Sequence, residues 1–124
     1  MSDEITVSVS IRAKKNGASF SMNQSFQDTM TGGNWSTGVA EVAASSTELI
    51  AVDDIVVYGW VFLHVLTATG DAYVDFGHST VVTDDTLCRL YAGESCVLKS
   101  AALTAVHAKS SSGTQKVEYA ILEL

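Results

Sequence analysis

One long apolar run, residues 55–66, constrains the fold of this chain more than any other segment. It reads Ile-Val-Val-Tyr-Gly-Trp-Val-Phe-Leu-His-Val-Leu, so both faces of a strand formed here are apolar. Such a strand lies in the middle of a sheet, or one of its faces meets another subunit. The short Gly-containing turn at residues 90–94 follows it and also favours a β-scaffold.

A length of 124 residues corresponds to one ordinary domain, so we expect residues 1–124 to form a single domain. Hydrophobic residues make up 47% of the chain, which is enough to bury a core. Charged residues make up only 17%, below the level of about 25% that is typical of soluble proteins. A surface with so few charges favours a protein that packs against copies of itself or against a partner.

The formal net charge of −7 argues against two classes of partner. Nucleic acids need a basic patch, and anionic membrane surfaces also attract basic segments. The basic pair Lys14-Lys15 precedes Asn16-Gly17, so we interpret it as a solvated turn. The acidic start of the chain does not resemble a signal peptide, and residues 55–66 are too few to cross a bilayer as a helix. We therefore expect a product made in the cytoplasm.

The first 30 residues show the pattern of a β-hairpin. Apolar residues alternate with polar ones over Ile5–Ile11, which predicts a half-buried strand. Asn16-Gly17 is a strong hairpin-turn signal. Phe20, Met22 and Phe26 then alternate with polar residues and predict the return strand.

The rest of the chain predicts further short strands. Within residues 35–46, Gly38–Ala44 could form a short helix, but the Ser- and Thr-rich surroundings and the neighbouring strands favour a strand. The other strands are expected over residues 47–52, 55–68, 72–76, 86–91, 95–100, 103–109 and 115–122, the last two forming a pair. About nine short strands with regularly spaced turns indicate an all-β, antiparallel sandwich or barrel.

Proline is absent from the whole sequence. The turns are therefore built with Gly, Asn, Asp and Ser, and no sheet edge can be blunted with proline. Since charges are also few, we expect some of the edges to be paired across subunits.

The two cysteines, Cys88 and Cys96, flank the turn near Ala92. In a simple hairpin centred on that residue they would face each other, so a cross-strand disulfide is one interpretation. Reduced, packed thiols are the preferred one, because a cytoplasmic product keeps its cysteines reduced.

The histidines and acids offer only one cluster for metal binding. His64 and His107 are interpreted as packed rings with one hydrogen-bonded nitrogen. Asp71, Asp75 and His78 could hold a divalent cation if the chain bends at Gly77. Turns also collect Asp for local hydrogen bonds, and that is the interpretation we favour.

No motif supports catalysis. The acid pairs at residues 53–54 and 84–85 look solvated, whereas acid/base pairs need two different environments around one cleft. The sequence holds no Gly-Xaa-Ser-Xaa-Gly elbow and no Gly-rich phosphate loop leading into a helix. We therefore assign no catalytic, cofactor-binding or metal-ligating residue and expect no enzyme activity.

Four short blocks of the sequence stand out together. They are Gly59-Trp60-Val61-Phe62-Leu63, Leu90-Tyr91-Ala92-Gly93-Glu94, Ala105-Val106-His107-Ala108-Lys109 and Val117-Glu118-Tyr119-Ala120-Ile121-Leu122-Glu123. With the polar opening at residues 1–11, these blocks resemble a loose group of small virion proteins of tailed phages. The group has a Gly-aromatic-x-Phe-Leu strand, a Gly-Glu turn, an Ala-containing strand and a short apolar-acidic C-terminal strand. An Arg-Asn pair usually follows the Phe-Leu, and here His64-Val65 stands in its place.

The resemblance implies a jelly-roll sandwich that builds or decorates a phage particle, with no catalytic residues. We expect a capsid decoration or cement protein that forms a homo-oligomer, a trimer in preference to other rings, on the major capsid protein of the virion. A tail or neck component is the first alternative. A carbohydrate-binding module using Trp35 or Tyr73 as its platform is the second. The residues expected at the subunit interface are Ile5, Val7, Val9, Trp35, Tyr58 and Trp60, because Trp and Tyr are enriched at interfaces and the N-terminal strand can reach a neighbour.

Overall fold

The computed structural model describes residues 5–29, 34–45, 48–49, 55, 58–67, 70–78, 86–103 and 105–123. These residues form strands and turns with no helix, as the sequence predicts. We predicted a single domain over residues 1–124, whereas the structure divides the chain into two compact units. The first unit is Met1–Thr31 and the second is Gly32–Leu124.

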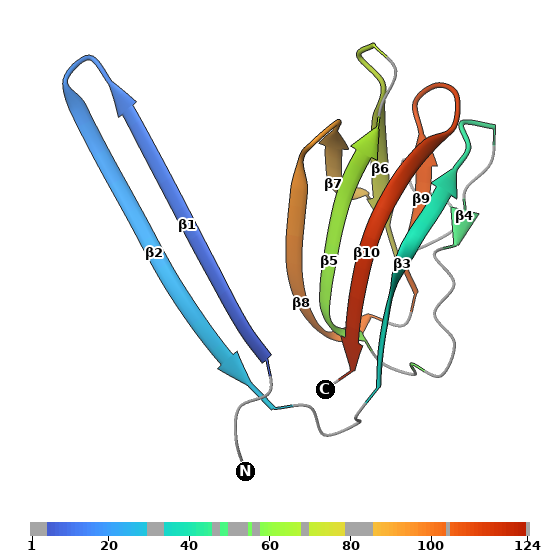
Figure 1. Ribbon diagram of the computed structural model, residues 1–124, viewed down its shortest axis with the longest axis horizontal. Coiled ribbons are helices and arrows are strands. Elements are labelled where there is room, and N and C mark those ends of the chain that lie inside the picture. The colour runs from blue at the N-terminus through green and yellow to red at the C-terminus, as the bar shows by residue number, and fades with distance from the viewer. Residues whose placement is uncertain are drawn as a thin grey trace. The chain divides into compact units, whose positions relative to one another are not determined.

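The first unit is a β-hairpin (Figure 1). Strand β1 (Ile5–Lys15) pairs antiparallel with β2 (Ala18–Asp28), and the pairing is regular from Ile5 opposite Asp28 to Lys15 opposite Ala18. The turn residues Asn16 and Gly17 have φ angles of 52° and 80°. A two-residue hairpin turn with positive φ at both positions matches the twist of its strands, and Asn-Gly is the pair that adopts it most readily. The predicted hairpin is therefore confirmed.

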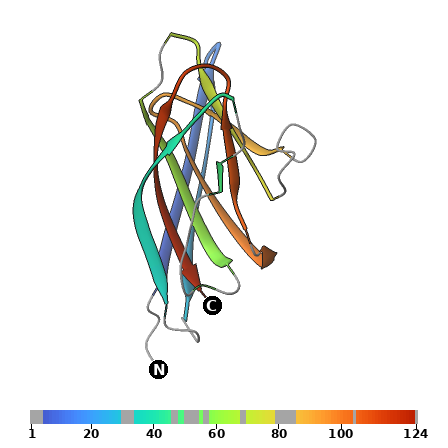
Figure 2. The same ribbon diagram turned by 90° about the vertical axis from the view of Figure 1, so that its right-hand side faces the viewer.

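The second unit is an antiparallel sandwich of two four-stranded sheets (Figures 1 and 2). One sheet has the order β3-β10-β5-β8 and the other β4-β9-β6-β7. If the eight strands β3 to β10 are renumbered 1 to 8, the strand orders of the two sheets become 1-8-3-6 and 2-7-4-5. These are the strand orders of a jelly roll. Its strands are β3 (Trp35–Val42), β4 (Glu48–Leu49), β5 (Tyr58–Thr67), β6 (Tyr73–Gly77), β7 (Thr86–Tyr91), β8 (Ser95–Leu103), β9 (His107–Ser110) and β10 (Gln115–Glu123).

One pairing expected from the sequence is wrong, and a second one that was considered for the two cysteines does not form. We expected the last two strands, β9 and β10, to pair with each other, but they belong to different sheets. The turn at residues 92–94 likewise joins β7 of one sheet to β8 of the other, instead of closing a simple hairpin. In a jelly roll most short turns cross between the sheets, so neighbours in sequence pack face to face across the core.

The strand with two apolar faces, β5, lies in the middle of its sheet between β10 and β8, in agreement with the sequence. Its residues Val61, Leu63 and Val65 point into the core and are fully buried. They meet Val74 and Phe76 of the opposite sheet in one hydrophobic cluster. The whole described core cluster lies in the second unit, so the sandwich has a hydrophobic core of its own.

Gly38 of the edge strand β3 leaves room for the ring of Tyr119 on β10. A Cβ atom at Gly38 would lie 3.0 Å from the hydroxyl oxygen of Tyr119 and 3.2 Å from its Cζ. We expect Gly38→Val to lower the free energy of unfolding by about 1–3 kcal/mol, because the ring must leave its place against the core. Urea unfolding measures the change. Thr37→Val, on the exposed face of the same strand, is the control and should change stability little.

Candidate interaction surfaces

The hairpin has one apolar and one polar face. In its register Val7 lies opposite Phe26, Ile11 opposite Met22 and Ala13 opposite Phe20. Since alternate residues of a strand point to opposite faces, all these side chains share one side of the hairpin. We call this side the apolar hairpin face. Gln24 lies among its apolar residues, and the charged residues Lys15 and Asp28 stand at its two ends. The apolar residues are Ile5, Val7, Val9, Ile11, Ala13, Ala18, Phe20, Met22 and Phe26.

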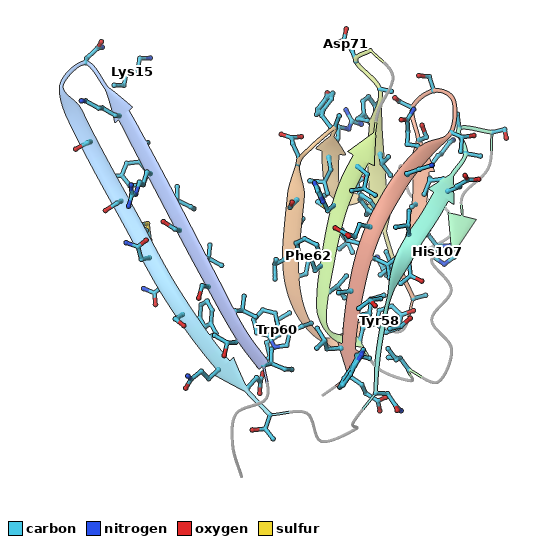
Figure 3. The ribbon with its side chains drawn as sticks, viewed as in Figure 1. Lys15, Tyr58, Trp60, Phe62, Asp71 and His107 are labelled. Carbon is cyan, nitrogen blue, oxygen red and sulfur yellow. The ribbon has the colours of Figure 1, made fainter. Side chains whose placement is uncertain are left out.

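The opposite face carries polar side chains at every position. Its residues are Thr6, Ser8, Ser10, Arg12, Lys14, Ser19, Ser21, Asn23, Ser25 and Gln27. Lys15 stands at the turn end of the hairpin (Figure 3). The hairpin is therefore amphipathic along its full length.

The apolar hairpin face is exposed over most of that length. Every residue from Ser8 to Gln27 is exposed, and the exposed fraction reaches 59% for Met22, 56% for Phe20 and 53% for Ile11. Soluble monomers rarely expose large contiguous apolar patches, and such patches mark interaction sites. This face is the strongest candidate interaction surface of the chain.

The sandwich exposes a second, smaller apolar surface. On the outer side of the β3-β10-β5-β8 sheet, Trp35 is 66% exposed, Val39 56% and Val97 41%. The register places Phe62, Ala120 and Leu122 on the same side, where they are half-buried. We call this surface the outer sheet face.

The six residues predicted for the interface fall in different places. Val9 lies on the apolar hairpin face with 42% of its surface exposed, Val7 is half-buried there and Ile5 is buried. Trp35 is the most exposed large apolar side chain among the described residues. The remaining two are buried: Tyr58 belongs to the core cluster, and Trp60 is 8% exposed, with the ammonium of Lys99 5.5 Å from its ring centroid.

The prediction omitted the large side chains of the return strand. Phe20, Met22 and Phe26 share the face of Val9 because the two strands pair in register. The signal was present in the sequence as the alternation of these residues with polar ones. Combined with the register that the Asn16-Gly17 turn imposes, this alternation places the three side chains on the face of Val9.

The acids and histidine considered for metal binding do not converge. Asp71 lies in the exposed turn before β6 (Figure 3), and His78 is exposed just after this strand. Asp75 is buried, and both of its carboxylate oxygens accept hydrogen bonds from Arg89, at 2.8 and 3.1 Å. The guanidinium of Arg89 also covers the ring of Tyr73, 3.8 Å from the ring centroid. Within the described part of the chain, no three metal-binding side chains lie together.

The remaining histidines are both half-buried in strands. His64 of β5 forms a polar contact with Glu118 of β10, 3.3 Å between Nδ1 and Oε1, as expected for a packed ring with one bonded nitrogen. His107 of β9 lies opposite Gly77 in the neighbouring strand.

Cys88 and Cys96 are free thiols that face each other between the two sheets, packed against the core. Burial, and next the neighbouring thiol of Cys96, raise the pKa of the Cys88 thiol to about 12. The folded state therefore favours the neutral thiol. Since the same thiol ionises near pH 9 in the unfolded chain, the free energy of unfolding falls as the pH rises from about 9 towards 12.

The raised pKa of Cys88 gives a prediction about its reactivity. The thiolate is the nucleophile, so we expect iodoacetamide to label Cys88 slowly in the folded protein at pH 7–8 and readily after unfolding. Peptide mapping by mass spectrometry measures the labelling. A rate at neutral pH equal to that of the unfolded chain would contradict the burial of this thiol.

Comparisons with protein-family models, curated proteins and solved structures found no match to this chain.

Among the residues that the structure describes, none forms a helix long and apolar enough to cross a membrane.

Proposed function

We propose that this chain is a structural protein of a tailed-phage particle, a decoration or cement protein that oligomerises on the outside of the head. The observation that carries the proposal is the exposed apolar hairpin face, joined to a sandwich that has its own core. A face of this kind is unfavourable in a monomer and becomes useful when copies assemble. The role proposed is assembly, with no catalytic step.

The jelly-roll sandwich and the low fraction of charged residues support this proposal. Jelly rolls are common in viral capsid domains, although a fold alone does not fix a function. Only 17% of the residues are charged, below the level of about 25% that is typical of soluble proteins. In the proposed assembly a homotrimer rests on the major capsid protein, and burial of apolar area stabilises the shell by about 25 cal/mol for each Å². The protein would be made in the host cytoplasm and reside in the virion.

A second candidate function is carbohydrate binding at the virion surface, and the exposure of Trp35 favours it. An exposed indole on the outer sheet face could stack on a sugar ring. Tyr73 is a poorer platform, because Arg89 covers one side of its ring and Tyr91 lies 5.6 Å away. A glycan array with wild type and Trp35→Ala tests this function: binding by wild type that the variant loses would favour it over the structural one.

Copy number per particle tests the proposed function. Quantitative mass spectrometry of purified virions of the encoding phage should find hundreds of copies if the protein decorates the head lattice. A copy number as low as that of a single small ring of subunits would assign the protein to the tail or neck instead. Absence from the particle would overturn the structural proposal.

A further inference from the structure

Among the residues that the structure describes, the hairpin forms a two-stranded sheet on its own, in which each strand is an edge. A two-stranded hairpin is marginally stable in water and needs a further strand or a packed face. Each eleven-residue strand is about 36 Å long, so both the unpaired edges and the apolar hairpin face are extensive. Neither edge contains a proline, and the charged residues of β1 are confined to its turn end, at Arg12, Lys14 and Lys15. The usual protections against edge pairing are therefore missing along most of the hairpin.

We propose that the apolar hairpin face is covered by the same face of other copies, arranged around a rotation axis that runs along the strands. This inference rests on the proposed self-assembly and names the surface that carries it. The occupant is another copy of this chain for two reasons. The two edges of the hairpin can pair with each other between copies, and the side chains of its two strands are complementary in size.

The two strands contribute side chains of different size to this face. Strand β1 supplies β-branched or small residues, Ile5, Val7, Val9, Ile11 and Ala13. The largest side chains come from β2. Rotation about an axis along the strands places β1 of one copy beside β2 of the next, so large side chains pack against small ones. Alternation of large and small residues across facing positions is what fills a core without voids.

The same rotation also satisfies the edges. Within one hairpin β1 and β2 are antiparallel, and β1 of one copy is antiparallel to β2 of the next. Neighbouring copies can therefore pair their edges in the way that the hairpin pairs its own strands. A closed ring leaves no edge open, whereas an open row of hairpins would keep growing.

The proposed orientation brings the basic turn ends of all copies together. Arg12, Lys14 and Lys15 lie at this end, so the copies repel each other there. Salt screens such repulsion, and we expect association to strengthen between low and high ionic strength. An opposite orientation would place Lys15 of one copy near Asp28 of another, at the other end of the face. Association that weakens with salt would therefore overturn the proposed direction of the axis.

A pair of variants on adjacent residues of β1 tests the surface itself. Ile11→Lys places a charge on the apolar hairpin face, and Ser10→Lys places the same charge on the polar face. Light scattering after size exclusion should give wild type and Ser10→Lys three times the chain's 13.1 kDa, and Ile11→Lys the mass of one chain. A monomeric wild type, or equal masses for the two variants, would overturn the inference.

Two further measurements separate this surface from its rivals. Ile11→Cys should form disulfide-linked chains on mild oxidation, whereas Ser10→Cys should not. Both variants retain Cys88 and Cys96, so the two native thiols cannot account for a difference between them. Val39→Lys alters the outer sheet face, and loss of the oligomer in this variant alone would assign assembly to the sandwich. The copy number in virions is measured independently. Abundant copies of a chain that is monomeric in solution would overturn this inference and leave the proposed function standing.

Discussion

Phe76→Ala is expected to lower the free energy of unfolding by about 3–5 kcal/mol. Phe76 of β6 is fully buried in the core cluster, and its removal leaves a cavity between the two sheets. Urea unfolding of the purified protein measures the loss. Since a domain of this size is stable by only about 5–15 kcal/mol, the variant should be close to unfolding at 37 °C.

Leu87→Ala in the neighbouring strand β7 is the control for this change. Leu87 is 43% exposed, and shortening it should alter stability by less than about 0.5 kcal/mol. Equal losses for the two variants would contradict the assignment of the core to the space between the sheets.

Deletion of residues 1–31 is expected to abolish the oligomer and leave the sandwich folded. The described core cluster contains no residue of the hairpin, so its apolar contacts survive the deletion. The shortened chain should run as a monomer and keep a cooperative thermal transition. Circular dichroism during heating measures the transition, and light scattering measures the mass.

The deletion has two informative failures. A shortened chain that still forms a trimer would move the assembly surface to the sandwich. Loss of the cooperative transition would show that the hairpin is needed for the fold of the second unit. Ser10→Lys in the full chain controls for a general effect of altering the N-terminal unit.

Much of the fold could be predicted from the sequence because the signals are local. The Asn16-Gly17 turn fixes the hairpin and its register, and both residues adopt the positive φ angles that the pair predicts. The alternation of apolar and polar residues identifies most strands, including β3, where a short helix was the alternative. The all-β class follows directly from these elements.

The pairing of strands could not be predicted in the same way. Alternation shows which side of a strand is apolar, but it does not show which strand lies beside it. The short turns after β7 and β9 look like hairpin turns in the sequence, yet each one crosses from one sheet to the other. The separation of the hairpin from the sandwich was missed for a related reason, since its alternation is the same whether the apolar side meets a core or solvent.

The different positions of Tyr58 and Trp60 also could not be predicted from the sequence. Tyr58 and Trp60 are two positions apart, so a regular strand would place both on one face. The register of β5 with β10 shifts between them, and Tyr58 enters the core while Trp60 stays opposite Leu122. Such a bulge has no reliable sequence signal beyond Gly59, which permits it.

Hydrogen–deuterium exchange of the hairpin amides tests the central claim, assembly through the apolar hairpin face, most directly. Edge amides of a bare two-stranded hairpin exchange rapidly, and pairing or packing between copies slows them. We predict slow exchange in β1 and β2 at high protein concentration and rapid exchange after dilution to the monomer, with the core of the sandwich protected throughout. Rapid exchange of the hairpin at every concentration, or protection that dilution does not change, would contradict assembly through this face.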